Sequence, residues 1–159
     1  MAKLLNNHTV VQIGMLTDNI EKATAAWADF LGVDMPGISI TDEYPVTKTN
    51  YRGNPSPARC KQSFFDLGKQ VRLELIEPDH EPSYWRECLD KNGPGFHHIA
   101  FFVEGMAQTS LMFEAEGMPL TMKGEWKGGR YAYHDASDKL NMVLELLEDD
   151  PTAGLVMDE

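Results

Sequence analysis

The chain has 159 residues, of which 42% are hydrophobic, and this length fits one domain that can bury a sizeable core around a closed site. The formal net charge of -11 disfavours nucleic acid as a partner, because phosphate binding needs clustered Lys and Arg, and these are scattered here. No apolar run reaches the roughly 20 residues of a membrane helix or forms a signal peptide. Cys60 and Cys88 suggest neither a disulfide framework nor a thiolate zinc site. We therefore expect a soluble cytoplasmic protein with no nucleic-acid or membrane partner.

A repeated pattern divides the chain into two similar halves. The segment Gln12–Val33 can be laid over His98–Met118, since each begins as a strand and continues as an amphipathic helix. In the first copy, Asp18 and Glu21 are predicted to form a capping box at the start of the helix. Gly32 is predicted to end that helix.

Each half also closes with a similar pattern. Ser63–Pro78 and Tyr131–Asp149 both read as hairpins, with LGKQ and ASDK as their turns. Short strands around Ile38–Ile40 and Leu120–Lys123 complete the order strand, helix and three strands in each half. The sequence thus predicts an α+β fold made of two βαβββ modules.

These elements define the expected domain organisation. One domain spans residues 8–148, with module one at 8–78 and module two at 96–148. A short linker helix at 82–93 is predicted to join the modules, and residues 149–159 are predicted to form a tail outside the core.

Two loop segments are candidates for substrate contact. Tyr51–Arg59 is rich in Pro and Gly, so we expect it to be irregular; it either covers a site or is an ordinary surface loop. Trp126, Lys127, Arg130 and Tyr131 either bind an anionic or acyl group or belong to a simple glycine turn that leads into a strand.

Four polar residues interrupt apolar strands at equivalent places in the two halves. Gln12 and His98 lie in the first strand of each half, and Glu74 and Glu145 lie in the last. Any one of them alone can be a hydrogen-bonded or solvent-facing residue, but independent accidents would not place all four at equivalent positions. An ionised carboxylate on an inward face is costly unless it is paired or binds metal. One nitrogen donor and three oxygen donors suit a divalent ion such as Zn, Ni, Co or Mn.

The alternation of side chains along strands sorts the neighbouring residues. Glu74 is expected to share a face with Arg72. His97 is expected to point away from His98, so that only one of the pair is a ligand. His134 is expected to be solvated in a loop.

These segments resemble the vicinal oxygen chelate superfamily over roughly residues 8–148. The resemblance rests on QIGMLTDNIEKA, LELIEP, GPGFHHIAFFV and MVLELLE. In this superfamily, paired βαβββ modules form an eight-stranded open cup, and the metal ligands come from the first and last strands of each module. The resemblance therefore implies such a cup with one divalent metal ion (Zn, Ni, Co or Mn) held by Gln12, Glu74, His98 and Glu145.

Two enzyme groups within the superfamily are similar in different respects. The ligand order resembles eukaryotic glyoxalase I, whereas the ELIEP and HHIAF segments resemble methylmalonyl-CoA epimerase. Leu16 and Pro78 stand where glyoxalase I has an arginine that contacts glutathione and an asparagine. Gln12 stands where the epimerase has a histidine, and the strand before Glu74 offers only Lys61 and Gln62 where the epimerase has a further carboxylate.

The resemblance implies a metal-dependent isomerase or lyase, active as a homodimer, that moves a proton next to a carbonyl in a small oxygenated or acyl-thioester substrate. Glu145 is the expected base and Glu74 the second candidate. One alternative is a ring-cleaving dioxygenase, although such iron enzymes typically use two His and one carboxylate. The other is a metal-free drug-binding protein of the bleomycin-resistance type.

Overall fold

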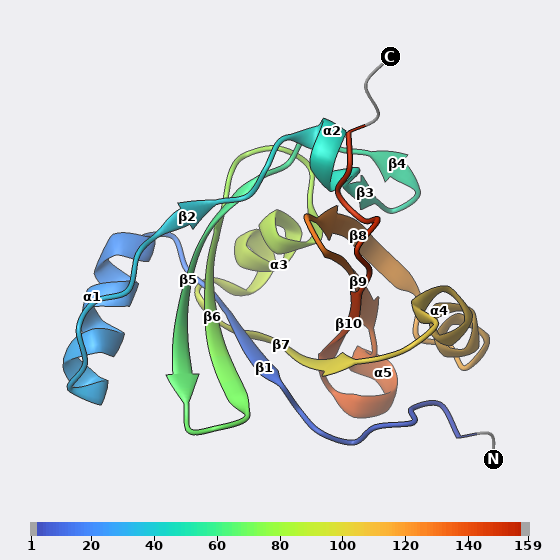
Figure 1. Ribbon diagram of the computed structural model, residues 1–159, viewed down its shortest axis with the longest axis horizontal. Helices are drawn as coiled ribbons and strands as arrows, with labels where there is room; N and C mark the ends of the chain where they lie inside the picture. Colours follow the sequence, from blue (N-terminus) through green and yellow to red (C-terminus); the bar gives the residue numbers. More distant parts are fainter. Residues whose placement is uncertain (1–2, 157–159) are drawn as a thin grey trace.

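The computed structural model describes residues 3–156 and contains one sheet that curls into a half-open barrel (Figure 1). The strands are β1 (Gln12–Leu16), β2 (Ser39–Ile40), β3 (Asn50–Tyr51), β4 (Asn54–Pro55), β5 (Cys60–Leu67), β6 (Val71–Pro78), β7 (Gly95–Phe102), β8 (Leu120–Trp126), β9 (Gly129–Asp135) and β10 (Val143–Asp149). The helices are α1 (Ile20–Leu31), α2 (Tyr44–Thr47), α3 (Tyr84–Asn92), α4 (Met106–Ala115) and α5 (Ser137–Leu140). No helix in residues 3–156 is long and apolar enough to cross a membrane.

The strand order confirms the two predicted βαβββ modules. Module one contributes β2-β5-β6-β1 to the sheet, and module two contributes β7-β10-β9-β8 in the mirrored order. The first strands β1 and β7 lie antiparallel at the centre, and each is flanked by the parallel last strand of its own module. Gln12 pairs with Ala100 across this centre, and Gly14 pairs with His98. An approximate two-fold axis between β1 and β7 therefore exchanges Gln12 with His98.

The sheet has ten strands instead of the expected eight, because the segment Tyr51–Arg59 is partly regular. β3 and β4 form a tight hairpin whose two turn residues, Arg52 and Gly53, both have positive φ. This backbone is typical of the two-residue turns that join antiparallel strands, so the glycine marks a hairpin turn. β3 also pairs with β8, so that a segment of module one extends the sheet of module two.

Helix α1 begins one residue later than predicted. Asn19 is its N-cap, and the Asn19 side chain accepts a hydrogen bond from the amide of Lys22 at 2.9 Å. Asp18 therefore lies outside the helix, and the predicted capping box with Glu21 does not form. Gly32 ends the helix as predicted, in the left-handed conformation with φ 66°.

Two glutamates join the ends of the last strands to the helices of their own modules. Glu77 accepts a hydrogen bond from the first amide of α1 at 2.7 Å. Glu148 accepts two from the amides at the start of α4, at 2.6 and 2.9 Å. Each lies three residues after Glu74 or Glu145, so the repeated ELIE and ELLE segments place one carboxylate inside the barrel and one at a helix N-terminus, where negative charge is favourable.

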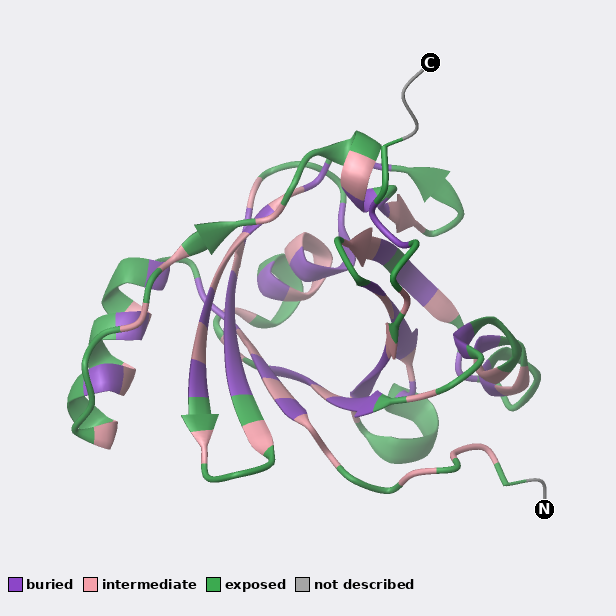
Figure 2. Ribbon diagram, in the orientation of Figure 1, coloured by how far each residue is buried: buried purple, intermediate pink, exposed green. Residues whose placement is uncertain are grey.

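The two faces of the sheet have different roles. The convex face packs against α1 in module one and α4 in module two, and Figure 2 shows a buried stripe on α1 with its outer side exposed. On the concave face, Trp85 of α3 packs with Ile76, Tyr133 and Val143 and closes one end of the barrel. Leu73 and Leu75 belong to the convex core, as strand alternation requires.

The segment after β10 folds back onto the β8–β9 hairpin. Ala153 is buried, and the amide of Gly154 donates to Glu125 at 2.9 Å. Residues 150–154 therefore pack against the domain instead of forming the expected free tail, because the turn after Asp150 reverses the chain. Residues 157–159 of the predicted tail lie outside the described residues.

Candidate metal and catalytic site

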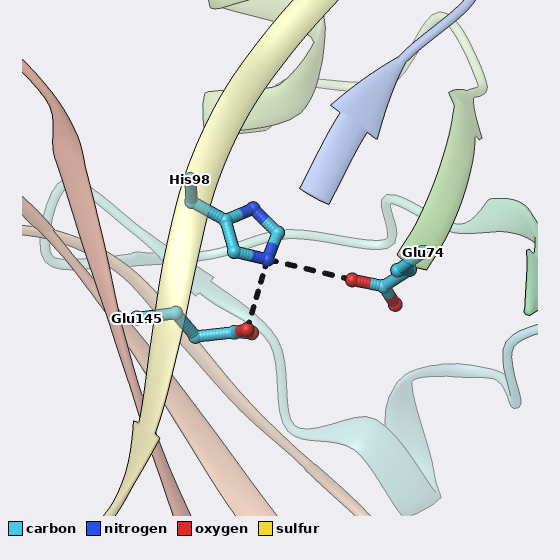
Figure 3. Close-up of side chains that lie close together, drawn as sticks. All are labelled: Glu74, His98 and Glu145. Atoms are coloured by element: carbon cyan, nitrogen blue, oxygen red, sulfur yellow. Dashed lines mark ion pairs between the residues drawn. The ribbon is translucent and has the colours of Figure 1, made fainter. Parts of the chain in front are cut away.

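Four adjacent strands bring the four predicted site residues together on the concave face. β6, β1, β7 and β10 supply Glu74, Gln12, His98 and Glu145 respectively, and all four side chains are buried. The ligand atoms of the two glutamates and the histidine lie within 4.8 Å of one another. Figure 3 shows the imidazole between the two carboxylates, with Nε2 at 3.0 Å from Oε2 of Glu145 and 3.5 Å from Oε2 of Glu74.

The two-fold relationship explains this convergence. Glu74 pairs with Gly14 in β1, two residues beyond Gln12. Glu145 pairs with Ala100 in β7, two residues beyond His98. The same offset in two parallel pairs places all four side chains at the centre of the barrel.

The carboxamide of Gln12 completes the cluster. Its Nε2 donates to Oε2 of Glu74 at 2.7 Å and to Oε2 of Glu145 at 3.1 Å. Nitrogen and oxygen of an amide have nearly the same size, and a half turn of the carboxamide would present Oε1 at this point. Gln12 can therefore hydrogen-bond the two carboxylates or coordinate a cation placed between them.

The cluster has two acidic groups and one basic group. Burial, reinforced by the charge of Glu145, raises the pKa of Glu74 to about 7. Burial opposes a charge on His98, but the charge and hydrogen bond of Glu145, together with Glu74, outweigh it and raise the pKa of His98. Two buried carboxylates beside one histidine attract a proton or a cation, so the donor set fits a divalent metal ion.

The two carboxylates differ in their remaining contacts. Oε1 of Glu74 accepts a hydrogen bond from Nε2 of Gln62 at 2.7 Å, so both of its oxygens are occupied. No such bond to Oε1 of Glu145 exists within residues 3–156. Gln62 was identified from sequence only as a residue in place of a carboxylate, and its contact follows from its place on β5 beside β6.

The expectation that His97 points away from His98 is wrong, because β7 contains a bulge. Gly14 pairs with His98 while Met15 pairs with Phe96, so His97 is the additional residue. A bulge redirects side chains, and here Nδ1 of His97 lies 3.0 Å from Nδ1 of His98. The Nε2 atom of His98 remains the one that faces the carboxylates.

His97 is suited to fix the orientation of the His98 ring. It is buried and packs against Tyr84 and Tyr133. Burial and the neighbouring His98 hold the pKa of His97 well below its usual range, which keeps it neutral. A neutral His97 can accept from Nδ1–H of His98 and leave Nε2 of His98 free as a ligand atom.

His134 is buried in β9, contrary to the expectation of a solvated loop. Its Nδ1 lies 2.9 Å from the carbonyl oxygen of Met118, and its Nε2 lies 2.9 Å from Oγ of Ser110. Since a carbonyl only accepts, Nδ1–H donates and Nε2 accepts from the hydroxyl. His134 therefore connects α4 to the convex face and does not belong to the cluster.

A cavity of about 690 Å³ opens above Gln12, Glu74 and Glu145. Of the four predicted loop contacts, Trp126 and Tyr131 line it. Lys127 is exposed in the hairpin turn, and Arg130 pairs with Asp150 instead. The other lining residues are Val11, Ile40, Thr41, Asp42, Thr47, Thr49, Ala58, Gln62, Phe64, Gln70, Arg72, Trp85, Phe102, Glu125, Tyr133, Leu147 and Asp149.

Within the segment Tyr51–Arg59, only Ala58 lines the cavity, and residues 40–49 form that wall instead. The chain that covers the cavity on this side is thus mainly residues 40–49, which include α2, and not the Pro-rich segment. In size and in its mixture of aromatic and polar lining, the cavity is typical of small-molecule sites.

Residues 11–134 match the family model of the Glyoxalase/Bleomycin resistance protein/Dioxygenase superfamily. A search of curated proteins finds no match.

Solved structures of methylmalonyl-CoA epimerases have a similar fold. The enzyme from Mycobacterium tuberculosis is 18% identical, with a TM-score of 0.61 over 95% of this chain and 94% of that chain. A variant of the Streptomyces coelicolor enzyme in complex with 2-nitronate-propionyl-CoA is 19% identical, with a TM-score of 0.61 over 89% and 96% of the two chains. An epimerase in complex with methylmalonyl-CoA and NH4+ is 19% identical, with a TM-score of 0.62 over 92% and 98%. Identities this low show a common fold.

Proposed function

The chain belongs to the Glyoxalase/Bleomycin resistance protein/Dioxygenase superfamily, and on that premise we propose that it is a divalent-metal-dependent isomerase or lyase that moves a proton on a carbon next to a carbonyl group. The observation that carries this proposal is the buried cluster of Glu74, His98 and Glu145 beneath a cavity of about 690 Å³.

The residues that would hold the ion are Gln12 through Oε1, the carboxylates of Glu74 and Glu145, and His98 through Nε2. This set of one nitrogen and three oxygen donors suits Zn, Ni, Co or Mn. Such an ion, when bound, stabilises negative charge on a substrate oxygen.

Glu145 is the proposed base. It lines the cavity, and its Oε1 has no hydrogen-bond partner within residues 3–156. Glu74 is less free to move a proton, because Gln62 donates a hydrogen bond to its Oε1. A positioned carboxylate can take a proton from substrate and return it to another position, which typically accelerates such steps by about 10²- to 10⁴-fold.

The epimerases with this fold support the choice of reaction, since two of them are complexes with methylmalonyl-CoA or 2-nitronate-propionyl-CoA. A glutathione substrate is less well supported. Leu16 is buried among apolar side chains and Pro78 is buried at the end of β6, so neither offers a polar group to glutathione. Only one of the four clustered residues is a histidine, which disfavours a ring-cleaving iron enzyme.

Solvent deuterium exchange tests the reaction without assuming a physiological substrate. The metal-loaded protein is incubated in D₂O with a panel of oxo acids, acyl thioesters and α-hydroxy ketones, and loss of the α-proton is followed by NMR. We expect exchange that needs both metal and Glu145. Glu145→Gln should abolish the exchange. Glu81→Gln, which removes an exposed carboxylate that does not line the cavity, should not. Exchange that persists in Glu145→Gln would contradict the assignment of the base.

A further inference from the structure

The charges around the cavity are unequal in number. The side chains that line it include the carboxylates of Asp42, Glu74, Glu125, Glu145 and Asp149. Among the described residues, Arg72 is the only Lys or Arg that lines it. Any anionic group of a ligand held inside this cavity, other than one at the metal, has one side chain of opposite charge to meet.

Arg72 lies beside the proposed metal site. It precedes Glu74 by two residues on β6 and pairs directly with Gln12 on β1. Residues two apart on a strand share a face and lie roughly 7 Å apart. The guanidinium lies over the ring of Phe64, 4.4 Å from its centroid, and Phe64 is the partner of Glu74 across β5 and β6.

The guanidinium of Arg72 is weakly engaged by the protein. Its nearest carboxylate, Asp66, is 4.0 Å from Nε, and both side chains are more than half exposed. Arg52, in contrast, forms a two-point contact with Glu87 at 2.8 and 3.1 Å. Stacking on Phe64 therefore orients Arg72 while leaving its terminal nitrogens available for a planar anion.

Arg72 has no charged counterpart in module two. Val143, which precedes Glu145 by two residues, occupies the equivalent place in module two and is buried beside Trp85 of α3. The lining of the cavity thus combines one cationic side chain, Arg72, with the aromatic side chains of Trp85 and Tyr133 and with the carboxylates of the cluster.

We propose that Arg72 binds a carboxylate of the substrate, and that the substrate is a short oxo-dicarboxylic acid whose carbonyl end lies at the metal and whose second carboxylate lies at Arg72. This inference rests on the proposed function. A coenzyme A tail carries several phosphates, and besides Glu125, which pairs with Lys48, and the two carboxylates at the metal, they would meet Asp42 and Asp149 with one arginine. The free acid therefore fits the charge pattern better than its coenzyme A thioester.

Calorimetry with non-reacting probes tests the subsite separately from catalysis. Succinate, glutarate and adipate, and the monomethyl ester of each, are titrated into the metal-loaded protein. The best diacid should bind Arg72→Gln roughly 10- to 100-fold more weakly than wild type, as for the loss of a charged hydrogen bond. Its monoester should lose less affinity than the diacid on Arg72→Gln, because its one remaining carboxylate can bind at the metal instead of at Arg72. Arg72→Lys should recover only part of the affinity, because Lys lacks the planar fork.

Lys69→Gln is the matched control, since Lys69 is exposed in the turn between β5 and β6 and does not line the cavity. Equal weakening by Lys69→Gln, equal weakening for the monoester, or tighter binding of a coenzyme A thioester than of the diacid would overturn the subsite. Absence of diacid binding would overturn it as well.

The kinetic counterpart uses 2-oxoglutarate and its 5-methyl ester in the deuterium-exchange assay. We expect Arg72→Gln to raise KM for the diacid with kcat unchanged, and to leave the ester unaffected. Charge-dependent diacid binding without any exchange would retain the subsite while rejecting the proposed reaction. Exchange that does not depend on Arg72 would retain the reaction and reject the subsite.

Discussion

A Cβ atom on Gly14 would lie 1.9 Å from Cε1 of His98, so the imidazole occupies the space that any side chain at position 14 would fill. The two residues pair across β1 and β7. At the equivalent place in module two stands Ala100, which pairs with Gln12, and the slimmer carboxamide side chain tolerates a methyl group there. The glycine is therefore part of the construction of the site.

Gly14→Ala should displace the His98 ring and weaken metal binding by roughly 10- to 100-fold, as is typical when the support of a ligand is lost. Crowding in the barrel should also lower the free energy of unfolding by about 1 to 3 kcal/mol. Gly37→Ala is the matched control, because a Cβ at Gly37 meets no atom within 4 Å. Calorimetric metal titration and urea unfolding measure both effects, and wild-type metal affinity in Gly14→Ala would show that the ring position does not matter.

Gln12→His should keep a working metal site, since imidazole can supply one neutral donor from the same strand position. Gln12→Leu should weaken metal binding, because it removes that donor. Titration of both variants with Zn and Co compares them. Equal affinity in Gln12→Leu and wild type would make Gln12 a bystander.

The raised pKa of Glu74 predicts how the metal-free protein responds to pH. A carboxyl group whose folded pKa is about 7, against an ordinary value near 4.5, stabilises the fold fully below pH 4.5 and loses that contribution as the pH rises through 7. The loss is about 1.4 kcal/mol for each unit of pKa difference.

Urea unfolding in the presence of a chelator, between pH 4.5 and 8, measures this effect. The free energy of unfolding of wild type minus that of Glu74→Gln should fall with rising pH, which removes the contributions of unrelated groups. Saturating metal should reverse the trend, because ligands must be deprotonated to bind. A difference that stays level or rises without metal would contradict the assigned burial of this carboxyl group.

The repeat made the convergence of the four candidate residues predictable, whereas contacts between elements did not follow from it. Gln12, Glu74, His98 and Glu145 could be found because a two-fold repeat places equivalent residues at one centre. The bulge at His97 could not, since the alternation rule assumes a regular strand.

Contacts between strands that are distant in sequence could not be predicted from the repeat either. The pairing of β3 with β8 joins the two modules, and neither repeat contains a counterpart for it. Likewise, the hydrogen bond from Gln62 to Glu74 depends on the register between β5 and β6. Such positions are set by long-range packing, for which hydrophobic periodicity carries little information.

Metal content is the most direct measurement of the central claim. Protein purified without added metal, or titrated afterwards with Zn, Ni, Co or Mn, should hold about one divalent ion per chain, as expected for a single cluster of four donors. Glu145→Gln should impair exchange of the substrate α-proton more than it impairs metal binding. Absence of metal after purification, together with no uptake of any of the four ions on titration, would contradict the account of this site as a metal-dependent enzyme centre.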